Sequence, residues 1–165
     1  MVNKSYSFLE KCYLDNFQEN KDTLFETKET IFNSFLKDKN NPNLSFKYIY
    51  KNNDAVGYYV INKNVEEKLK PFVDYLIIDF YVIPAERRRG FASNCFKNIL
   101  STGNISLGFV LEDESIKGKK LVDKLSKELH IKVQKSSGQY PDKASTKLYV
   151  INGKTKESKE IKEGF

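Results

Sequence analysis

One stretch of this chain limits its possible folds more than any other. Residues 72–83 are almost continuously apolar and rich in Val, Ile, Tyr and Phe, and Asp79 is the only carboxylate within 75–84. This pattern is typical of a central strand that other elements cover on both faces. Because Pro84 follows, we expect a buried strand that ends in a turn.

The remaining residues alternate between helical and strand patterns. Apolar spacing predicts helices over 5–16, 24–36, 87–100 and 113–130. Alternation and short apolar runs predict strands over 44–50, 55–62, 105–111, 131–134 and 147–151. Since a strand–helix–strand unit makes a right-handed crossover, strands 72–83 and 105–111 should be parallel neighbours. The sequence therefore predicts an α/β fold with a mixed, mostly antiparallel central sheet flanked by helices.

The length of 165 residues suits about one domain. We expect residues 1–165 to form a single domain, with 1–20 as an extra N-terminal helix and 152–165 as a charged tail. The apolar runs are too short to cross a bilayer, and the first residues lack the apolar core of a secretion signal. Two Cys and one His do not suit a disulfide framework or an ordinary zinc cluster. These features predict a cytoplasmic, metal-free domain.

The net charge of +6 has two interpretations. It is either a solvated, lysine-rich surface or the mark of an anionic partner such as nucleic acid, phosphate or a nucleotide cofactor. Acidic residues are interspersed among the basic ones, and the clearest exception is the triplet Arg87, Arg88 and Arg89. The triplet therefore directs attention to the turn after the buried strand.

This turn combines several features of an anion site. Gly90 follows the arginines and precedes the helical pattern. The first amides of a helix have no intrahelical acceptor, and the helix dipole adds partial positive charge there. Glycine lets a ligand approach the backbone, and arginine offers paired donors to phosphate. A diphosphate suits such a site, although the pattern is neither a P-loop nor a dinucleotide fingerprint.

The same junction resembles a known signature. Val82-x-Pro84-x-x-Arg87-x-x-Gly90-x-Ala92 is similar to the acyl-CoA signature of the GNAT superfamily of N-acetyltransferases. That signature reads Arg/Gln-x-x-Gly-x-Gly/Ala after a strand that commonly ends in Val-x-Pro. The resemblance implies a GNAT-like fold in which the parallel strand pair splays at a cofactor site. It also implies acetyl-CoA as the cofactor and transfer of an acetyl group to an amine by direct attack on the thioester.

The resemblance assigns cofactor contacts to individual residues. Backbone groups at the strand end would pair with the pantetheine arm, and the amides at the helix start would hold the pyrophosphate. Arg87 and Arg89 would add charge, and Ser115 could contact the cofactor in place of an Asn that commonly opens the next helix. The implied cofactor-binding residues are Tyr81, Val82, Ile83, Arg87, Arg88, Arg89, Gly90, Phe91, Ala92, Ser93 and Ser115.

The reaction also needs a base for the acceptor ammonium. Asp79 is our candidate, because burial of a carboxylate favours proton uptake. The alternative is a carboxylate paired with a structural Lys or Arg. Glu112 and Asp113, at the end of the next strand, are other candidates or else helix caps.

The general acid is less clearly marked in the sequence. In the GNAT family a Tyr on the next helix serves this role, and here Val122 falls at that position. Tyr140 and Tyr149 are candidate substitutes. The missing Tyr also supports an alternative, a catalytically weak or inactive GNAT-fold binding protein. A second alternative is a basic nucleic-acid-binding module that uses the arginine triplet and aromatic residues.

Overall fold

The computed structural model describes residues 6–20, 27–67, 69–101, 105–112, 116–129, 134–135 and 146–152. The helices within these ranges are α1 (Phe8–Asn20), α2 (Lys28–Lys39), α3 (Phe91–Ser101) and α4 (Ile116–Leu129), with a 3₁₀ turn η1 (Pro84–Glu86). The strands are β1 (Leu44–Lys51), β2 (Asp54–Asn62), β3 (Tyr75–Val82), β4 (Ser106–Glu112), β5 (Gln134–Lys135) and β6 (Thr146–Asn152). Among the described helices, none has the length and apolarity required to cross a membrane.

The described strands form one mixed sheet in the order β1-β2-β3-β4-β6-β5. The central pair, β3 and β4, is parallel, and the other neighbouring pairs are antiparallel. The sequence prediction of a mixed, mostly antiparallel sheet with this parallel pair is confirmed.

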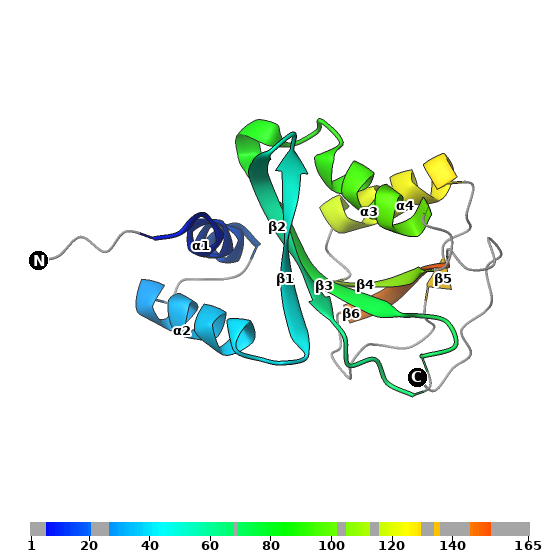
Figure 1. The fold of residues 1–165 in the computed structure, drawn as a ribbon, viewed down its shortest axis with the longest axis horizontal. Coiled ribbons are helices and arrows are strands. Elements are labelled where there is room, and N and C mark those ends of the chain that lie inside the picture. Colours follow the sequence, from blue (N-terminus) through cyan, green and yellow to red (C-terminus); the bar gives the residue numbers. More distant parts are fainter. Residues whose placement is uncertain are drawn as a thin grey trace, which may run out of the picture.

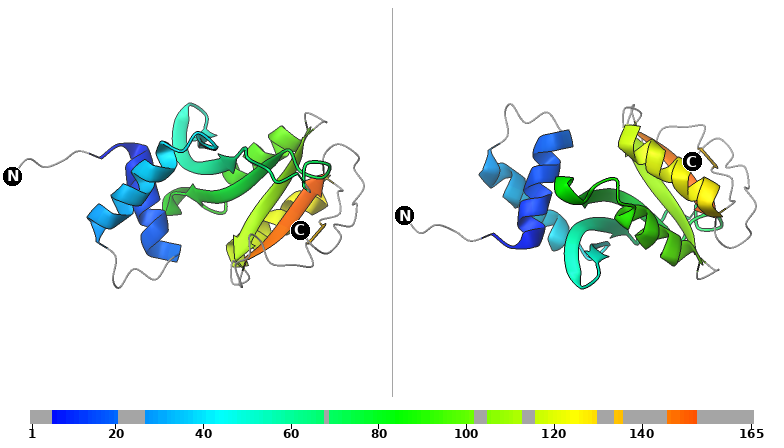
Figure 2. Two further views of the ribbon diagram at one scale, coloured as in Figure 1. Left: turned by 90° about the horizontal axis from the view of Figure 1, so that it is seen from below. Right: turned by 90° about the horizontal axis from the view of Figure 1, so that it is seen from above.

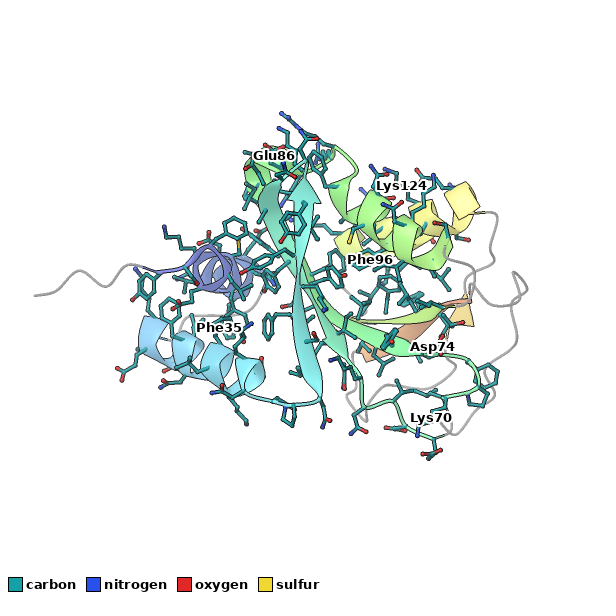
Figure 3. The ribbon with its side chains drawn as sticks, viewed as in Figure 1. Phe35, Lys70, Asp74, Glu86, Phe96 and Lys124 are labelled. Carbon is teal, nitrogen blue, oxygen red and sulfur yellow. The ribbon has the colours of Figure 1, made fainter. Side chains whose placement is uncertain are left out.

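Helices cover both faces of the sheet. Figure 1 shows α1 and α2 on one side of β1 to β3 and α3 with α4 on the other, and Figure 2 shows the same separation from two further directions. Phe35 lies in the apolar cluster under α1 and α2, and Phe96 in the cluster under α3 (Figure 3). A third cluster, around Leu76 and Leu148, is covered by residues 65–67 and 69–73. Burial on both faces explains the continuous apolar pattern of β3.

Two features of β3 decide where its side chains and backbone point. Its parallel pairing with β4 runs from Tyr75 opposite Leu107 to Ile77 opposite Phe109 and covers three residue pairs. Beyond Ile77, the two strands diverge, as the GNAT resemblance implied. On the opposite edge, the register with β2 shifts, so that Ile78 is an extra residue in β3.

The Ile78 bulge changes the alternation of side chains. Ile77 and Phe80 both pack in the cluster under α3, although they are three residues apart. Tyr81 packs in the cluster under α1 and α2, and Asp79 is bonded to groups on that same side. The bulge therefore turns Asp79 toward α1.

Several predicted boundaries differ from the observed ones, and three of the differences have a clear physical cause. β3 begins at Tyr75 rather than residue 72, because Val73 lies in a turn before the strand. The amide of Val73 donates to the carbonyl oxygen of Leu69, and the Val73 side chain is buried. The third helix begins at Phe91 rather than residue 87, since Arg88 and Gly90 have positive φ and break the helical path. The second helix begins at Lys28 rather than residue 24, because the Thr27 side chain caps it by accepting from the amide of Thr30.

Candidate active site

A large cleft opens where β3 and β4 separate. Its volume is about 1200 Å³, and it is lined by the diverging parts of both strands, by α1, and by the facing starts of α3 and α4. Glu86 and Lys124, which both line it, lie on the same edge of the molecule (Figure 3). We call the part next to residues 86–93 and α4 the α3 end, and the part next to α1 and α2 the α1 end.

The backbone at the α3 end forms a cradle over residues 88–93. Arg88 has φ of 63° and Gly90 has φ of 82°, with one residue between them. The amide of Asn94 donates to the carbonyl oxygen of Gly90 at 2.8 Å and closes the first turn of α3. The amides of Phe91, Ala92 and Ser93 precede that bond, where helical N–H groups lack an intrahelical acceptor. This end thus offers backbone donors and the positive pole of a helix dipole to an anion.

Gly90 also leaves room for a ligand. A Cβ built on it would meet the Lys124 ammonium at 3.5 Å and the Asn94 side-chain amide at 3.9 Å, which are ordinary contact distances. Its positive φ is a conformation that glycine adopts without strain. The cradle is therefore open above its backbone and has a lysine beside it.

A row of lysines on α4 faces the cradle. Lys117, Lys120 and Lys124 line the cleft at helical spacing. The Lys124 ammonium lies 3.9 Å from Glu128, which also accepts a 3.4 Å hydrogen bond from the buried hydroxyl of Ser93. The α3 end is consequently basic on two walls, with Arg88 on one and the lysines on the other.

Arg87 binds protein groups rather than facing open space. Its Nη1 and Nη2 donate to the two carboxylate oxygens of Glu19 at 2.6 and 2.7 Å, and its Nε donates to the carbonyl oxygen of Val82 at 2.8 Å. The guanidinium also stacks over the Tyr81 ring, 5.0 Å from its centroid. Lys117 donates to the same Glu19 carboxylate at 2.6 Å. Glu19 of α1 therefore joins the turn after β3 to α4 across the cleft.

These contacts change the acid–base behaviour of Glu19. Hydrogen bonding from Arg87, and then from Lys117, lowers the pKa of the Glu19 carboxyl from its ordinary value of 4.5 to about 2, against the opposing effect of burial. The carboxylate therefore stays charged well into the acidic range. The bridge across the cleft is therefore a permanent ion pair near neutral pH.

The end of β3 presents part of its backbone to the cleft. The amide of Ile83 donates to Val56 of β2, and the carbonyl of Tyr81 lies against Gly57 of the same strand. Backbone groups alternate in direction along a strand, so those of Val82 face away from β2. The carbonyl of Val82 accepts from Arg87. Tyr81, Val82 and Ile83 are the strand-end residues expected to pair with pantetheine. Of these three, Val82 has its backbone groups directed toward the splay.

The α1 end contains a hydrogen-bonded cluster around Asp79. The Asn16 side-chain amide donates to both carboxylate oxygens, at 2.9 and 3.0 Å, and to the Tyr58 hydroxyl oxygen at 2.8 Å. The Tyr58 hydroxyl donates to Asp79 at 3.0 Å. The sequence suggested that Asp79 is either a base or the partner of a structural Lys or Arg. The structure adds hydrogen bonds to its carboxylate from two neutral donors, Asn16 and Tyr58.

A second carboxylate lies farther along the same end. The Tyr13 hydroxyl of α1 donates to Asp38 of α2 at 3.2 Å, and the Tyr13 ring stacks on the Tyr58 ring with centroids 6.5 Å apart. Burial, followed by the nearby carboxylates Asp38 and Asp79 respectively, raises the pKa of both tyrosines above the ordinary value. Both phenols stay protonated and act as donors. The α1 end is thus acidic and phenolic, opposite in charge to the α3 end.

The cleft brings together most of the predicted site residues. Its lining includes Asp79, Tyr81, Val82, Arg87, Arg88, Gly90, Phe91, Ala92 and Ser93. Ile83, Arg89 and Tyr149 are not part of the lining: Arg89 pairs with Glu86, and Tyr149 packs on β6 against the main cluster. Ser115, Tyr140 and Asp113 lie outside the described residues, as does the side chain of Glu112.

Sequence reasoning missed several lining residues. The lysines of α4 recur at three- and four-residue spacing, a signal that could have been noticed once the helix was predicted. Asn16, Tyr58, Tyr13 and Asp38 carried no local signal, because they are brought together by packing of α1 and α2 on the sheet. Val122, at the position of the expected Tyr, is 1% exposed and belongs to the apolar core.

Comparison with known proteins identifies the fold. No family model and no curated protein matches the sequence. An acetyltransferase from Thermus thermophilus superposes with a TM-score of 0.58 at 13% identity, over 87% of this chain and 88% of that chain. A GNAT-family acetyltransferase from Bacillus cereus gives 0.53 at 12% over 96% of both chains. The diaminobutyrate acetyltransferase of Paenibacillus lautus, solved with its substrate and coenzyme A, gives 0.53 at 15% over 88% and 87%. The chain has the GNAT N-acyltransferase fold.

Proposed function

We propose that this protein is an acetyl-CoA-dependent N-acyltransferase that transfers an acetyl group to an amine. The observation that carries the proposal is that one cleft contains a backbone anion cradle, the splay of β3 from β4 and a carboxylate. Structural neighbours named as acetyltransferases support it, and one of them was solved with coenzyme A and a diamino acid.

The residues present fit a coenzyme A molecule. The cradle amides of 91–93 and the open space over Gly90 suit a pyrophosphate, and Arg88, Lys120 and Lys124 supply positive charge around it. The diverging strand ends, with the backbone of Val82, suit an extended arm. Arg87 would act indirectly, since its guanidinium fixes the turn through Val82 and Glu19.

We assign the acid–base step to the α1 end. Acetyl-CoA would supply an activated acetyl thioester whose sulfur would depart as a thiolate. Asp79 accepts a proton from the acceptor ammonium, directly or through water, and makes the amine nucleophilic. The apolar walls formed by Ile77 and Phe80 limit water near the reacting groups.

The charge of the α1 end favours a cationic acceptor. Asp38 and Asp79 line it together with the partly exposed ring of Phe17. Carboxylates attract an ammonium group, and aromatic faces add cation–π attraction. A positively charged amine therefore suits this end, while the anionic cofactor suits the α3 end.

The direct test is an acetyl-transfer assay. Purified protein is incubated with acetyl-CoA and a panel of amines, free thiol is followed with time, and products are checked by mass spectrometry for one added acetyl group. We expect thiol release that depends on a cationic amine. Binding of acetyl-CoA without turnover on any amine would instead support a GNAT-fold binding protein, an alternative favoured by the core position of Val122.

The nucleic-acid alternative receives less support from the geometry. Arg87 is paired with Glu19 and Arg89 with Glu86, so two of the three arginines already contact carboxylates. Salt-dependent RNA or DNA binding stronger than that of a lysine-rich control protein would revive it.

A further inference from the structure

We propose that Asn16 and Tyr58 are positioning residues that hold the Asp79 carboxylate in the orientation required to take a proton from the acceptor. The inference rests on the proposed acyl-transfer function. It gives α1, which the sequence marked only as an extra helix, a direct part in building the site.

The side chains of Asn16, Tyr58 and Asp79 form a triangle of hydrogen bonds. Each pair among Asn16, Tyr58 and Asp79 is joined by a hydrogen bond, with distances from 2.8 to 3.0 Å. Asn16 is 7% exposed, and Tyr58 is fully buried. Because both donors are fixed by packing, the carboxylate plane has little freedom to rotate. A fixed orientation matters for proton transfer, which depends on placing the base within hydrogen-bond reach of the proton.

Three elements that are distant in the sequence supply the cluster. Asn16 lies on α1, Tyr58 on β2 and Asp79 on β3. The extra residue Ile78 in β3 turns Asp79 onto the face that α1 covers. Aromatic contacts of Tyr58 with Tyr13, Phe46 and Tyr81 fix its ring, and these rings lie under α1 and α2. The cluster thus depends on the docking of α1 against the sheet.

The chemistry of the donors suits a base. An amide and a phenol are neutral, and both donate hydrogen bonds that orient the Asp79 carboxylate. The other titratable groups that line this end are Tyr13 of α1, Asp38 of α2, Tyr81 of β3 and, beyond them, Glu19 with Arg87. The Tyr13 hydroxyl donates to Asp38, and Glu19 accepts hydrogen bonds from Arg87 and Lys117. Asn16 and Tyr58 are therefore the described side chains whose hydrogen bonds to Asp79 fix its direction.

The experiment compares the variants Asn16→Leu, Tyr58→Phe and Asp79→Asn with wild type. Leucine retains the branched shape of asparagine without its donors, and phenylalanine retains the ring. We expect Asn16→Leu to lower kcat about 10- to 100-fold and Tyr58→Phe about 3- to 10-fold, with the acetyl-CoA Kd within about twofold of wild type. The acid limb of the pH–rate profile should move to higher pH in both, since a donor to the charged carboxylate is lost.

A double-mutant cycle separates positioning from a merely structural role. If Asn16 acts through Asp79, Asn16→Leu combined with Asp79→Asn is no slower than Asp79→Asn alone. Multiplying losses, or full activity of both single variants, would overturn the inference. If Asn16→Leu does not fold, Tyr58→Phe carries the same cycle. A wild type that transfers no acetyl group would overturn the proposed function itself, and the role of Asp79 with it.

Discussion

The two ends of the cleft are built in different ways. At the α3 end, a contiguous run over residues 88–93 forms the cradle, largely from backbone groups. The α1 end is instead formed by side chains that are distant in the sequence. Asn16 is separated from Tyr58 by 42 residues and from Asp79 by 63. The α3 end should consequently be sensitive to backbone conformation and charge, and the α1 end to loss of single polar atoms.

The largest expected effect falls on the α1 end. Asp79→Asn keeps the size of the side chain but removes the base, so we expect kcat to fall by about 100-fold or more. Acetyl-CoA affinity, measured by calorimetry, should change less than about twofold, because the cradle is elsewhere. Equal losses in both quantities would mean that the two ends are not separable in the way described.

The substitution Gly57→Ala tests whether the end of β3, which leads into the α3 end of the cleft, has to keep its position. A Cβ there would lie 2.0 Å from the carbonyl oxygen of Tyr81, so Gly57→Ala must displace the end of β3. We expect the free energy of unfolding to fall by about 2 kcal/mol and acetyl-CoA binding to weaken. Urea denaturation with Ser45→Ala on β1 as control checks the first expectation. Unchanged stability would contradict the rigidity assigned to this strand end.

The α4 lysines test the charge of the α3 end. Replacing Lys120 and Lys124 with Glu should raise the acetyl-CoA Kd about 10-fold, with a smaller effect at high salt. The matched control replaces the exposed Lys28 and Lys37 of α2 with Glu, which changes net charge equally. The same loss in both double variants would point to overall charge rather than to a local site.

The smallest effect concerns the Glu19 bridge between the ends. The pKa of Glu19 is lowered to about 2, below the ordinary value of 4.5, so its stabilising contribution is complete above pH 4.5 and is lost as pH falls through about 2. We expect Glu19→Gln to lower the free energy of unfolding by about 1 kcal/mol near pH 7, with the difference vanishing near pH 2. Glu66→Gln, at an exposed position, is the control. A difference that persists in acid would exclude the ion pair as its source.

The two ends of the cleft also differ in how far they could be predicted from the sequence. The cradle was predictable because a strand, a proline, a glycine and a helix start follow one another in sequence. The splay followed from the GNAT resemblance rather than from the residues themselves. Even there, the pairing of Arg87 with Glu19 joins residues 68 apart, so the sequence alone did not reveal this partner of the guanidinium.

The α1 end was largely beyond sequence reasoning. Helical spacing predicts a helix near Asn16 but not which polar residue faces the sheet, because that depends on how α1 docks. The bulge at Ile78 has no marker in an apolar run, yet it decides which face Asp79 joins. Asp79 was noticed as a lone carboxylate in a buried strand, whereas its partners depend on long-range packing.

The central claim is that the turn at Gly90 binds the cofactor, and calorimetry with acetyl-CoA tests it most directly. Wild type is compared with Gly90→Glu, with Gly90→Asn, which tolerates positive φ without charge, and with Asn98→Glu, which places the same charge on the exposed far part of α3. Circular dichroism verifies folding of each variant. We predict binding by wild type and Asn98→Glu, and no binding by Gly90→Glu. Equal binding by Gly90→Glu, or none by wild type, would contradict the account.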